Sequence, residues 1–394
     1  MSAAALAVAV ATLATWLYLI LGRGGFWRGR ECDRALVRSG DGDIAAWPRV
    51  VAIIPARDEA AYVGTAIRSL LRQDYPGPFA IILVDDQSAD GTVEVARRAA
   101  VETGGADRLT IISGCDLPPG WTGKLWAMRQ GITEHENGPE PSDFLWFSDA
   151  DIAYAPGVLR RLVAGAVARG TVLTSLMVKL RCQSAAERLL IPAFVFFFQK
   201  LYPFAFVNDP GRRTAAAAGG CMLVRRAALA AAGGLEAIRG AIIDDCALGA
   251  LLKRQGPIWL GLTEDAASLR AYPAFGDIRR MVARSAYAEL DYSPARLAGA
   301  VAGMTLVYLT PPLVTVFATG AAQALGATAW ALMALAYRPI LRLYRLNPLW
   351  GLALPAIAAI YTGFTVDSAV QHWQGRGGAW KGRVQGHVSR SAVR

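Results

Sequence analysis

The sequence has few charged residues for its length. Charged residues make up 18% of the 394 positions and hydrophobic residues 54%, whereas charged residues form about a quarter of an ordinary soluble domain. This composition excludes disorder as the dominant state. It is also too apolar for a plain soluble protein.

Cysteine and histidine are scarce as well. The five cysteines lie far apart and include no C-x-x-C pair, which argues against a disulfide framework and fits a reducing compartment. None of the three histidines lies near a pair of cysteines, which argues against a zinc site. Cys221 and Cys246 lie close to polar motifs, but buried cysteines usually act as small apolar side chains.

Three common catalytic motifs are missing. Residues 120–125 include Gly-Lys, but Pro118 replaces the first glycine of a P-loop and Leu125 replaces its Ser or Thr. No G-x-S-x-G is present, and no G-x-G-x-x-G follows a strand with an acid downstream. The chain is therefore not expected to be a P-loop NTPase, an α/β-hydrolase or a nicotinamide-dependent enzyme.

Positive charge is in excess. Lys and Arg number 41 against 31 Asp and Glu, a net charge of +10. The basic residues flank apolar segments and do not form a surface of mixed aromatic and basic residues. We therefore expect contact with membrane lipids and no nucleic-acid partner.

The first apolar run, residues 2–21, has no charged side chain over 20 positions. A helix of that length crosses a hydrocarbon core of about 30 Å. No basic residue precedes the run, as one would in a signal peptide. Five follow it: Arg23, Arg28, Arg30, Arg34 and Arg38. We predict a transmembrane anchor over residues 1–22, with its C-terminal side in the cytoplasm.

A second apolar block, residues 297–373, is predicted to form the C-terminal membrane helices. Its first 40 residues contain no charge and allow two crossings with a turn near residues 320–326. Residues 350–370 are a third candidate, although they include Asp367. If all three cross, the basic tail 374–394 lies outside, against the preference of basic residues for the cytoplasm. A re-entrant or interfacial segment is the alternative.

Residues 189–207 are apolar and rich in Phe, but they also contain two prolines, Gln199 and Lys200. A crossing here would separate Asp85 and Asp245 on opposite sides of the membrane. We predict an interfacial helix whose aromatic side chains dip into lipid. The alternative is a buried core helix.

Between residues 47 and 294 the pattern changes to alternating strands and helices. Short apolar runs predict strands and ten-residue amphipathic stretches predict helices, which together indicate a mostly parallel sheet covered on both faces. The predicted strands are 50–54, 79–84, 109–112, 144–147 and 171–178, and the helices are 59–72, 90–101, 124–133 and 157–168. The fold class is thus α/β, with a cytoplasmic domain between membrane helices.

Acidic residues follow three of these strands. Glu59 comes shortly after the first, Asp85 and Asp86 after the second, and Asp149 and Asp151 after the fourth. Ligands of such sheets bind beyond the carboxyl ends of the strands. Because Asp149 and Asp151 are two positions apart, both carboxylates can reach one hard cation, Mg²⁺ or Mn²⁺. The sequence therefore predicts a divalent-cation site at this edge.

Six segments occur in an order that resembles a known enzyme family. They are VAIIPARDEA, LVDDQSADGT, GWTGKLWAM, FSDAD, GGCMLVRR and IIDDCALG. Together they resemble the membrane-anchored family 2 glycosyltransferases, which have a Rossmann-like GT-A fold. The segment GWTGKLWAM and the terminal WKGRVQ are most similar to the hopene-associated (HpnB-type) glycosyltransferases.

The resemblance implies a role for each matching position. Asp85 meets the base of a nucleotide-sugar donor, Asp151 binds the metal, and Asp245 is the catalytic base. Asp58 and Asp244 stand where the family has Asn and Glu, and only Arg284 remains of the family's Q-x-x-R-W element. The implied donor-binding residues are Pro55, Arg57, Glu59, Asp85, Asp86, Lys124, Asp149 and Arg284, and the implied metal ligands are Asp149 and Asp151.

These roles imply a metal-dependent, inverting transfer of a sugar to a lipid hydroxyl, linked to hopanoid synthesis at the inner membrane. Lys124 and Arg284 would add positive charge at the diphosphate, and Asp245 would take the acceptor proton. Each of these three residues also has a simpler alternative role. Lys124 would be a lysine on a helix surface, Arg284 would contact only lipid phosphates, and Asp245 would cap a helix. The alternative functions are a polyprenyl-phosphate sugar synthase and a non-catalytic scaffold that binds nucleotide-sugars. The sequence leaves the oligomeric state open.

Overall fold

The structure is a computed structural model that describes residues 3–36, 44–377, 379–380 and 383–384. The chain forms two compact units, each of which is described by itself. The helical unit consists of Met1–Gly29, Cys182–Ala205 and Ala271–Ala379. The sheet unit consists of Arg30–Arg181, Phe206–Arg270 and Trp380–Arg394.

The sheet unit is built on one mixed sheet with the strand order β3-β2-β1-β4-β7-β6-β8-β5. Strands β3, β2, β1 and β4 are parallel, whereas β7 runs antiparallel to both of its neighbours. The strands are β1 (Val50–Ala56), β2 (Phe79–Asp85), β3 (Leu109–Ser113), β4 (Phe144–Ser148), β5 (Ile152–Tyr154), β6 (Leu173–Lys179), β7 (Cys221–Arg225) and β8 (Ile258–Ser268). This is the predicted mostly parallel sheet.

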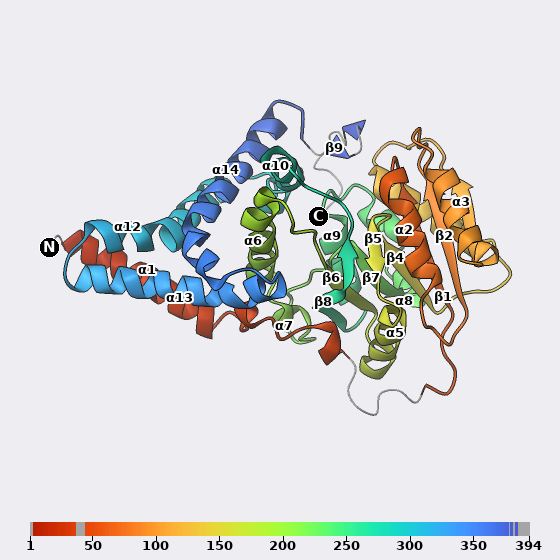
Figure 1. Cartoon of the computed structure of the whole chain (residues 1–394), viewed down its shortest axis with the longest axis horizontal. Coiled ribbons are helices and arrows are strands. Elements are labelled where there is room, and N and C mark those ends of the chain that lie inside the picture. Colours follow the sequence, from red (N-terminus) through yellow and green to blue (C-terminus); the bar gives the residue numbers. More distant parts are fainter. Residues whose placement is uncertain (1–2, 37–43, 378, 381–382, 385–394) are drawn as a thin grey trace. The chain divides into compact units, whose positions relative to one another are not determined.

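Helices cover both faces of the parallel half (Figure 1). Side chains of alternate β1 residues, such as Val50 and Ala52, join a core with α2, α3 and α5. On the other face, Gly131 of α4 lies directly against Ile53. The helices are α2 (Ala60–Leu71), α3 (Thr92–Glu102), α4 (Gly123–Glu136), α5 (Val158–Arg169), α7 (Phe204–Val207), α8 (Arg226–Ala231) and α9 (Asp244–Lys253). The right-handed crossovers of βαβ units explain this two-sided cover.

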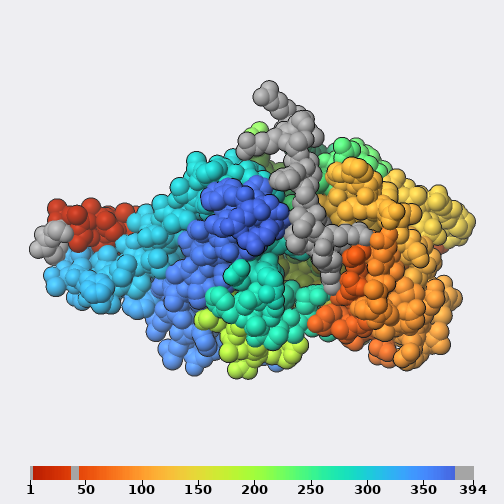
Figure 2. Space-filling model, turned by 90° about the horizontal axis from the view of Figure 1, so that it is seen from above, coloured from red at the N-terminus to blue at the C-terminus, as the bar shows by residue number. Residues whose placement is uncertain are grey.

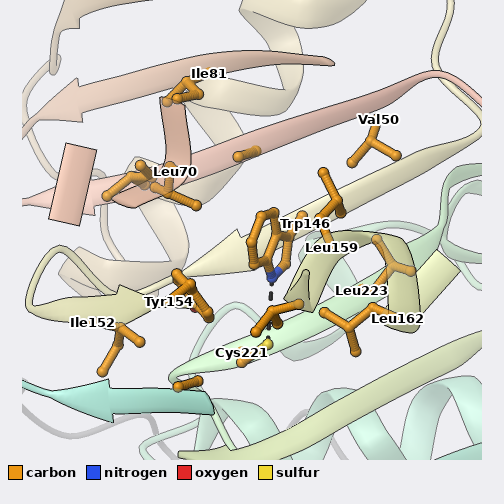
Figure 3. Packing of buried hydrophobic residues seen from close by; sticks show 14 of the residues in the cluster. Val50, Leu70, Ile81, Trp146, Ile152, Tyr154, Leu159, Leu162, Cys221 and Leu223 are labelled. Atoms are coloured by element: carbon orange, nitrogen blue, oxygen red, sulfur yellow. Dashed lines mark hydrogen bonds between the residues drawn. The ribbon is translucent and has the colours of Figure 1, made fainter. Parts of the chain in front are cut away.

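The core of the sheet unit centres on Trp146 of β4 (Figure 3). Its indole N–H donates to the Sγ of Cys221 at 3.4 Å. Burial raises the pKa of the Cys221 thiol to about 12, so this cysteine is an unreactive core residue.

Two strands of the eight-stranded sheet, β5 and β8, have no counterpart in the sequence-based prediction, whereas β7 corresponds to the strand-like CMLV stretch at residues 221–224. Strand β5 has only three residues, too few for an alternating pattern to stand out. Strand β8 begins with the apolar run from Ile258 but continues through Glu264 and Asp265, which are unfavourable in strands. It is held by pairing with β6 and β5, an example of tertiary context outweighing local preference.

Among its described residues, the helical unit contains four segments that are long and apolar enough to cross a membrane. Its elements are α1 (Ala3–Leu21), α6 (Ala185–Leu201), α10 (Phe275–Ala283), α11 (Pro294–Met304), α12 (Thr310–Phe317), α13 (Ala321–Leu343) and α14 (Leu354–Trp373). The candidate spans are Ala3–Leu21, Pro294–Phe317, Ala321–Leu343 and Pro348–Trp373. These match the predicted anchor and the three predicted C-terminal segments, with the chain turning at Gly320.

The surface of these helices is apolar. Figure 2 shows α1, in red, beside α12 and α13, in light blue, and these helices contact one another. Large apolar side chains such as Leu21, Val316 and Phe317 are exposed there. A continuous apolar surface of this kind fits contact with lipid.

The environment of the aromatic residues of α6 differs from our prediction, which was that their side chains dip into lipid. Phe196 and Phe197 are buried, and their rings pack against Tyr337, Tyr308 and Tyr361. The Tyr361 hydroxyl also donates to the α6 backbone at 2.8 Å. Aromatic side chains bury a large area and favour edge-to-face contacts with other rings, so protein covers the face that we expected to meet lipid.

Candidate active site

The candidate site lies at one edge of the sheet. Strands β2, β1 and β4 are adjacent and parallel, so the loops that follow them leave the sheet at the same edge. Pro55 is the penultimate residue of β1 and pairs in register with Val84 of β2. Beyond these strand ends come most of the acidic residues that the sequence singled out.

Asp85 is the last residue of β2 and Asp86 follows it, and both are buried, with 9% and 1% exposure. The Asp86 N–H donates to the carbonyl of Ala56 at 2.7 Å, and Arg57 Nη1 donates to the carbonyl of Asp86 at 2.6 Å. Asp85 Oδ1 has no hydrogen-bond partner among the described residues. A buried carboxylate oxygen without a partner is unfavourable, so this atom is suited to accept an N–H from a ligand.

Hydrogen bonds join the loop after β1 to the loop after β2 and to the start of α3. Asp58 has a positive φ of 50°, a left-handed conformation in which Asn and Asp are the most tolerated residues after glycine. Its Oδ1 accepts from the N–H of Ala89 at 2.9 Å, and the Glu59 N–H donates to the Thr92 hydroxyl at 2.8 Å. The replacement of the family's Asn by Asp at this position therefore suits the local backbone.

Lys124 joins the two acidic motifs of the site. It lies in the first turn of α4, and its Nζ is 2.8 Å from Asp149 Oδ1 and 3.2 Å from Asp244 Oδ2. Burial alone would lower the pKa of Lys124, but Asp149 and Asp244 raise it well above its ordinary value. Lys124 is therefore a largely buried cation held between these carboxylates and not a surface lysine.

Asp245 lies in the first turn of α9. Its Oδ2 accepts from the Gly219 N–H at 2.9 Å, and its Oδ1 accepts from the Cys246 N–H at 2.7 Å. Burial and the adjacent charge of Asp244 raise the pKa of Asp245 to about 6. A Cβ atom at Gly219 would lie 3.1 Å from Lys124 Nζ and 3.3 Å from Asp245 Oδ2, so glycine keeps the space between these groups open.

Arg270 is a site residue that the sequence analysis missed. It follows β8, and its Nε donates to Asp151 Oδ2 at 2.9 Å. Its Nη2 donates to both carboxylate oxygens of Glu59, at 2.5 and 2.7 Å. The only sequence signal was a basic residue after a strand, and it was missed because β8 itself was not recognised.

Asp149 and Asp151 therefore pair with different cations, Lys124 and Arg270. Burial and the charge of Asp151 raise the pKa of Asp149, although Lys124 opposes the shift. Arg284 belongs to the helical unit, where it follows α10 with an exposed side chain. The other predicted site residues all belong to the sheet unit.

The comparisons with known proteins identify the family. Residues 48–259, more than half of the chain, match the sequence profile of glycosyltransferase-like family 2. The chain belongs to this family. No curated protein matches it.

A solved structure supports the fold of this glycosyltransferase. The mannosyltransferase PcManGT from Pyrobaculum calidifontis, in complex with GDP-Man and Mn²⁺, has a TM-score of 0.51 at 19% identity. The match covers 94% of this chain and 99% of that protein. S. aureus TarS 1–349 with UDP-GlcNAc is a looser match, with a TM-score of 0.39, 14% identity and coverage of 83% and 92%. The sheet unit thus has the GT-A fold that the resemblance implied.

The candidate site has more negative than positive side chains, which favours binding of a divalent cation. Five carboxylates and two cations meet here: Glu59, Asp149, Asp151, Asp244 and Asp245 with Lys124 and Arg270. Within the described ranges, no three acidic, histidine or cysteine side chains are placed to hold a metal by themselves. Asp149 and Asp151 would supply two oxygen ligands, and Mg²⁺ commonly takes its remaining ligands from substrate phosphates and water.

Proposed function

We propose that this glycosyltransferase moves a sugar from a nucleoside-diphosphate sugar to the hydroxyl of a membrane lipid, with inversion at the sugar carbon. The observation that supports this most directly is the position of Lys124. It bridges Asp149, a proposed cation ligand, and Asp244, the neighbour of the proposed base Asp245. The groups for a leaving diphosphate and for an attacking hydroxyl therefore belong to one cluster.

The donor binds at the carboxyl ends of β1, β2 and β4. Asp85 accepts an N–H of the nucleotide base through its unpartnered oxygen. Pro55 at the end of β1 and the β1–α2 loop, with Arg57 and Glu59, lie under the nucleotide, and Asp86 fixes Arg57. The fold shared with a mannosyltransferase that binds GDP-Man and Mn²⁺ supports a donor of this class together with a divalent cation.

Transfer needs positive charge at the leaving group and a base at the acceptor. A divalent cation, when bound, neutralises the charge that develops on the diphosphate. Asp149 and Asp151 would hold it, and Lys124 adds fixed positive charge beside them. Asp245 removes the proton of the acceptor hydroxyl as the hydroxyl oxygen attacks the anomeric carbon and the nucleoside diphosphate leaves. One direct displacement inverts that carbon.

The acceptor is a lipid because the described residues include four helical segments long and apolar enough to cross a membrane. The sheet unit faces the cytoplasm, where nucleotide-sugars are made, since arginines follow the N-terminal anchor. The link to hopanoids rests on the resemblance of GWTGKLWAM and WKGRVQ. Part of the latter segment lies outside the described residues.

A transfer assay tests this function. The full chain in lipid vesicles is given UDP-, GDP- and dTDP-sugars, each with a hopanoid polyol, diacylglycerol or polyprenyl phosphate, and nucleotide release and product configuration are measured. We expect one donor to react with a hydroxyl acceptor and to give the inverted product. Transfer to polyprenyl phosphate alone would identify the alternative synthase, and the absence of turnover with every pair would favour a scaffold.

A further inference from the structure

Lys200, near the end of α6, has an unusual environment in the helical unit. Its Nζ lies 4.6 Å from the ring centre of Tyr308 and 5.5 Å from that of Phe197. Its ammonium donates to Met304 Sδ at 3.9 Å, and a thioether sulfur is a weak acceptor. Within the part of the chain that the structure describes, Lys200 thus sits among aromatic rings without a strong acceptor.

A second cation lies beside it. Arg23, two residues after α1, donates to the backbone carbonyls of Lys200 and Leu201 at 3.2 and 3.0 Å. Burial, together with the charge of Arg23, lowers the pKa of Lys200 to about 8. The two positive side chains therefore repel each other. An anion between them would reduce this repulsion and would also stabilise the buried charge of Lys200.

Neither cation has a carboxylate within ion-pair distance among the described residues. Tyr308, whose ring covers Lys200, is fully buried, and its hydroxyl also has no partner in the described part of the chain. Buried polar groups in native proteins are nearly always paired. Among the described residues, the Lys200 ammonium and the Tyr308 hydroxyl therefore lack a strong acceptor, while Arg23, which donates to backbone carbonyls, has no carboxylate to neutralise its charge. Arg23 comes just after the predicted anchor helix, where lipid headgroups begin.

We propose that Arg23 and Lys200, assisted by Tyr308, bind the phosphate group of a bilayer phospholipid. A phosphate is the expected ligand because arginine and lysine recognise it by charge-assisted hydrogen bonds, and because a phosphate at headgroup depth is present in every phospholipid. Basic pockets between membrane helices bind lipid headgroups in this way. The site does not depend on sugar transfer and would exist even if the proposed activity were wrong.

Thermal unfolding of the full chain in neutral detergent tests the site. Phosphatidylglycerol is titrated in parallel with diacylglycerol, which has the same tails and no phosphate. A ligand that binds only the folded state raises Tm, and the rise grows with the logarithm of ligand concentration above Kd. We expect phosphatidylglycerol, and not diacylglycerol, to raise the Tm of the wild type. An equal effect of both lipids would overturn the proposal.

Two variants test the residue itself. Lys200→Met keeps the length of the side chain and removes its charge, and should weaken the phosphatidylglycerol effect about tenfold in lipid concentration. Lys200→Arg keeps the charge and should retain the effect, as should the control Lys253→Met, whose ammonium instead binds backbone carbonyls. If Lys200→Met responds like the wild type, the lysine does not bind lipid.

Two further ligands test whether the bound phosphate belongs to a bilayer phospholipid, to free phosphate or to a polyprenyl phosphate. Inorganic phosphate should not raise Tm at concentrations where phosphatidylglycerol does, and stabilisation by inorganic phosphate alone would overturn a lipid site. Polyprenyl phosphate should act no more strongly than phosphatidylglycerol. Stabilisation at a much lower concentration would instead make the site part of acceptor binding and overturn the assignment to bilayer phospholipid.

Discussion

Asp245 is the residue on which the proposed chemistry depends. Its carboxylate accepts two backbone N–H groups at the start of α9, which favours the charged form. Burial and Asp244 nevertheless raise its pKa to about 6. A carboxylate with this pKa is charged at neutral pH and is still a stronger base than an ordinary aspartate, which suits proton removal from a hydroxyl.

Replacing this carboxylate should stop the chemical step. Asp245→Asn keeps the shape and one acceptor oxygen but removes the base, so we expect kcat to fall by about 10²–10⁴-fold with little change in donor affinity. Single-turnover rates and nucleotide-sugar binding measure the two effects. Asp107→Asn, at an exposed aspartate after α3, is the control and should retain full activity. A comparable loss of donor binding in Asp245→Asn would instead assign Asp245 to the donor side.

The raised pKa also predicts the pH profile. The base must be deprotonated, so kcat/KM should be low below the pKa of Asp245, rise through about pH 6 and level off above it. The sign follows because the active form is the charged one. Initial rates between pH 4.5 and 8 with a hydroxyl acceptor measure this limb. A flat profile from pH 5 to 8 would mean that Asp245 does not take the proton in the limiting step.

At this scale the sequence was informative about single residues and not about their partners. Asp85 and Asp149 could be placed at strand ends because apolar runs precede them. The ion pair of Asp151 with Arg270 could not, since 119 positions separate the two residues and only the pairing of β5 with β8 brings them together. Lys124 was expected to contact the diphosphate, but its bridge between Asp149 and Asp244 required the structure.

At the scale of elements, Arg270 ties together three parts of the sheet unit. It extends from β8 to Asp151, which precedes β5, and to Glu59, which precedes α2. Both carboxylates are largely buried, so removal of the guanidinium would leave two charges without their cation. This connection fixes the β1–α2 loop against the turn that we propose holds the divalent cation.

Arg270→Gln should therefore destabilise the sheet unit. We expect the free energy of unfolding to fall by about 1–3 kcal/mol, because the two buried carboxylates lose a charged partner. Chemical denaturation followed by tryptophan fluorescence measures the change. The control is Arg280→Gln, which removes an exposed pair with Asp277 and should change stability by less than about 0.5 kcal/mol. Equal effects of the two substitutions would show that the Arg270 pairs contribute no more than surface pairs.

Because Asp149 and Asp151 lie together in the β4–β5 turn, we predict that sugar transfer depends on a divalent cation. Chelator should abolish transfer, and Mg²⁺ or Mn²⁺ should restore it, because the leaving diphosphate needs its charge neutralised. Asp151→Asn should raise the Mn²⁺ concentration needed for half-maximal rate, which titration of the chelated enzyme measures. Full activity in excess chelator would contradict the assignment of both aspartates.

The elements themselves were predictable where the local pattern was strong. The first four predicted strands and the helices between them differ from the structure by only a few residues, because the strands are mostly apolar runs and α2 and α3 each have a distinct apolar face. The pattern could not distinguish lipid from protein as the cover of α6, since a Phe-rich helix meets either equally well. The rings of Tyr308, Tyr337 and Tyr361 that bury it come from helices more than 100 positions away.

For the whole molecule, the distribution of arginines predicts the orientation in the membrane. Arginines follow the candidate span Ala3–Leu21 and lie near the end of Ala321–Leu343, whereas the connection around Thr319 has no basic residue. Short basic connections stay in the cytoplasm. The sheet unit and the connection near Arg345 should therefore be cytoplasmic, and Thr319 external.

Fusions of the truncated chain to alkaline phosphatase or green fluorescent protein measure this orientation. The phosphatase is active only outside the cytoplasmic membrane, and the fluorescent protein folds only inside it. We expect fluorescence after Trp47 and after Arg345 and phosphatase activity after Thr319, because each candidate span reverses the side. A fusion after Arg376 adds the last span, Pro348–Trp373, which reverses the side again only if it crosses. Phosphatase activity after Trp47 would place the sheet unit outside, away from cytoplasmic nucleotide-sugars, and would remove the donor that the proposed reaction requires.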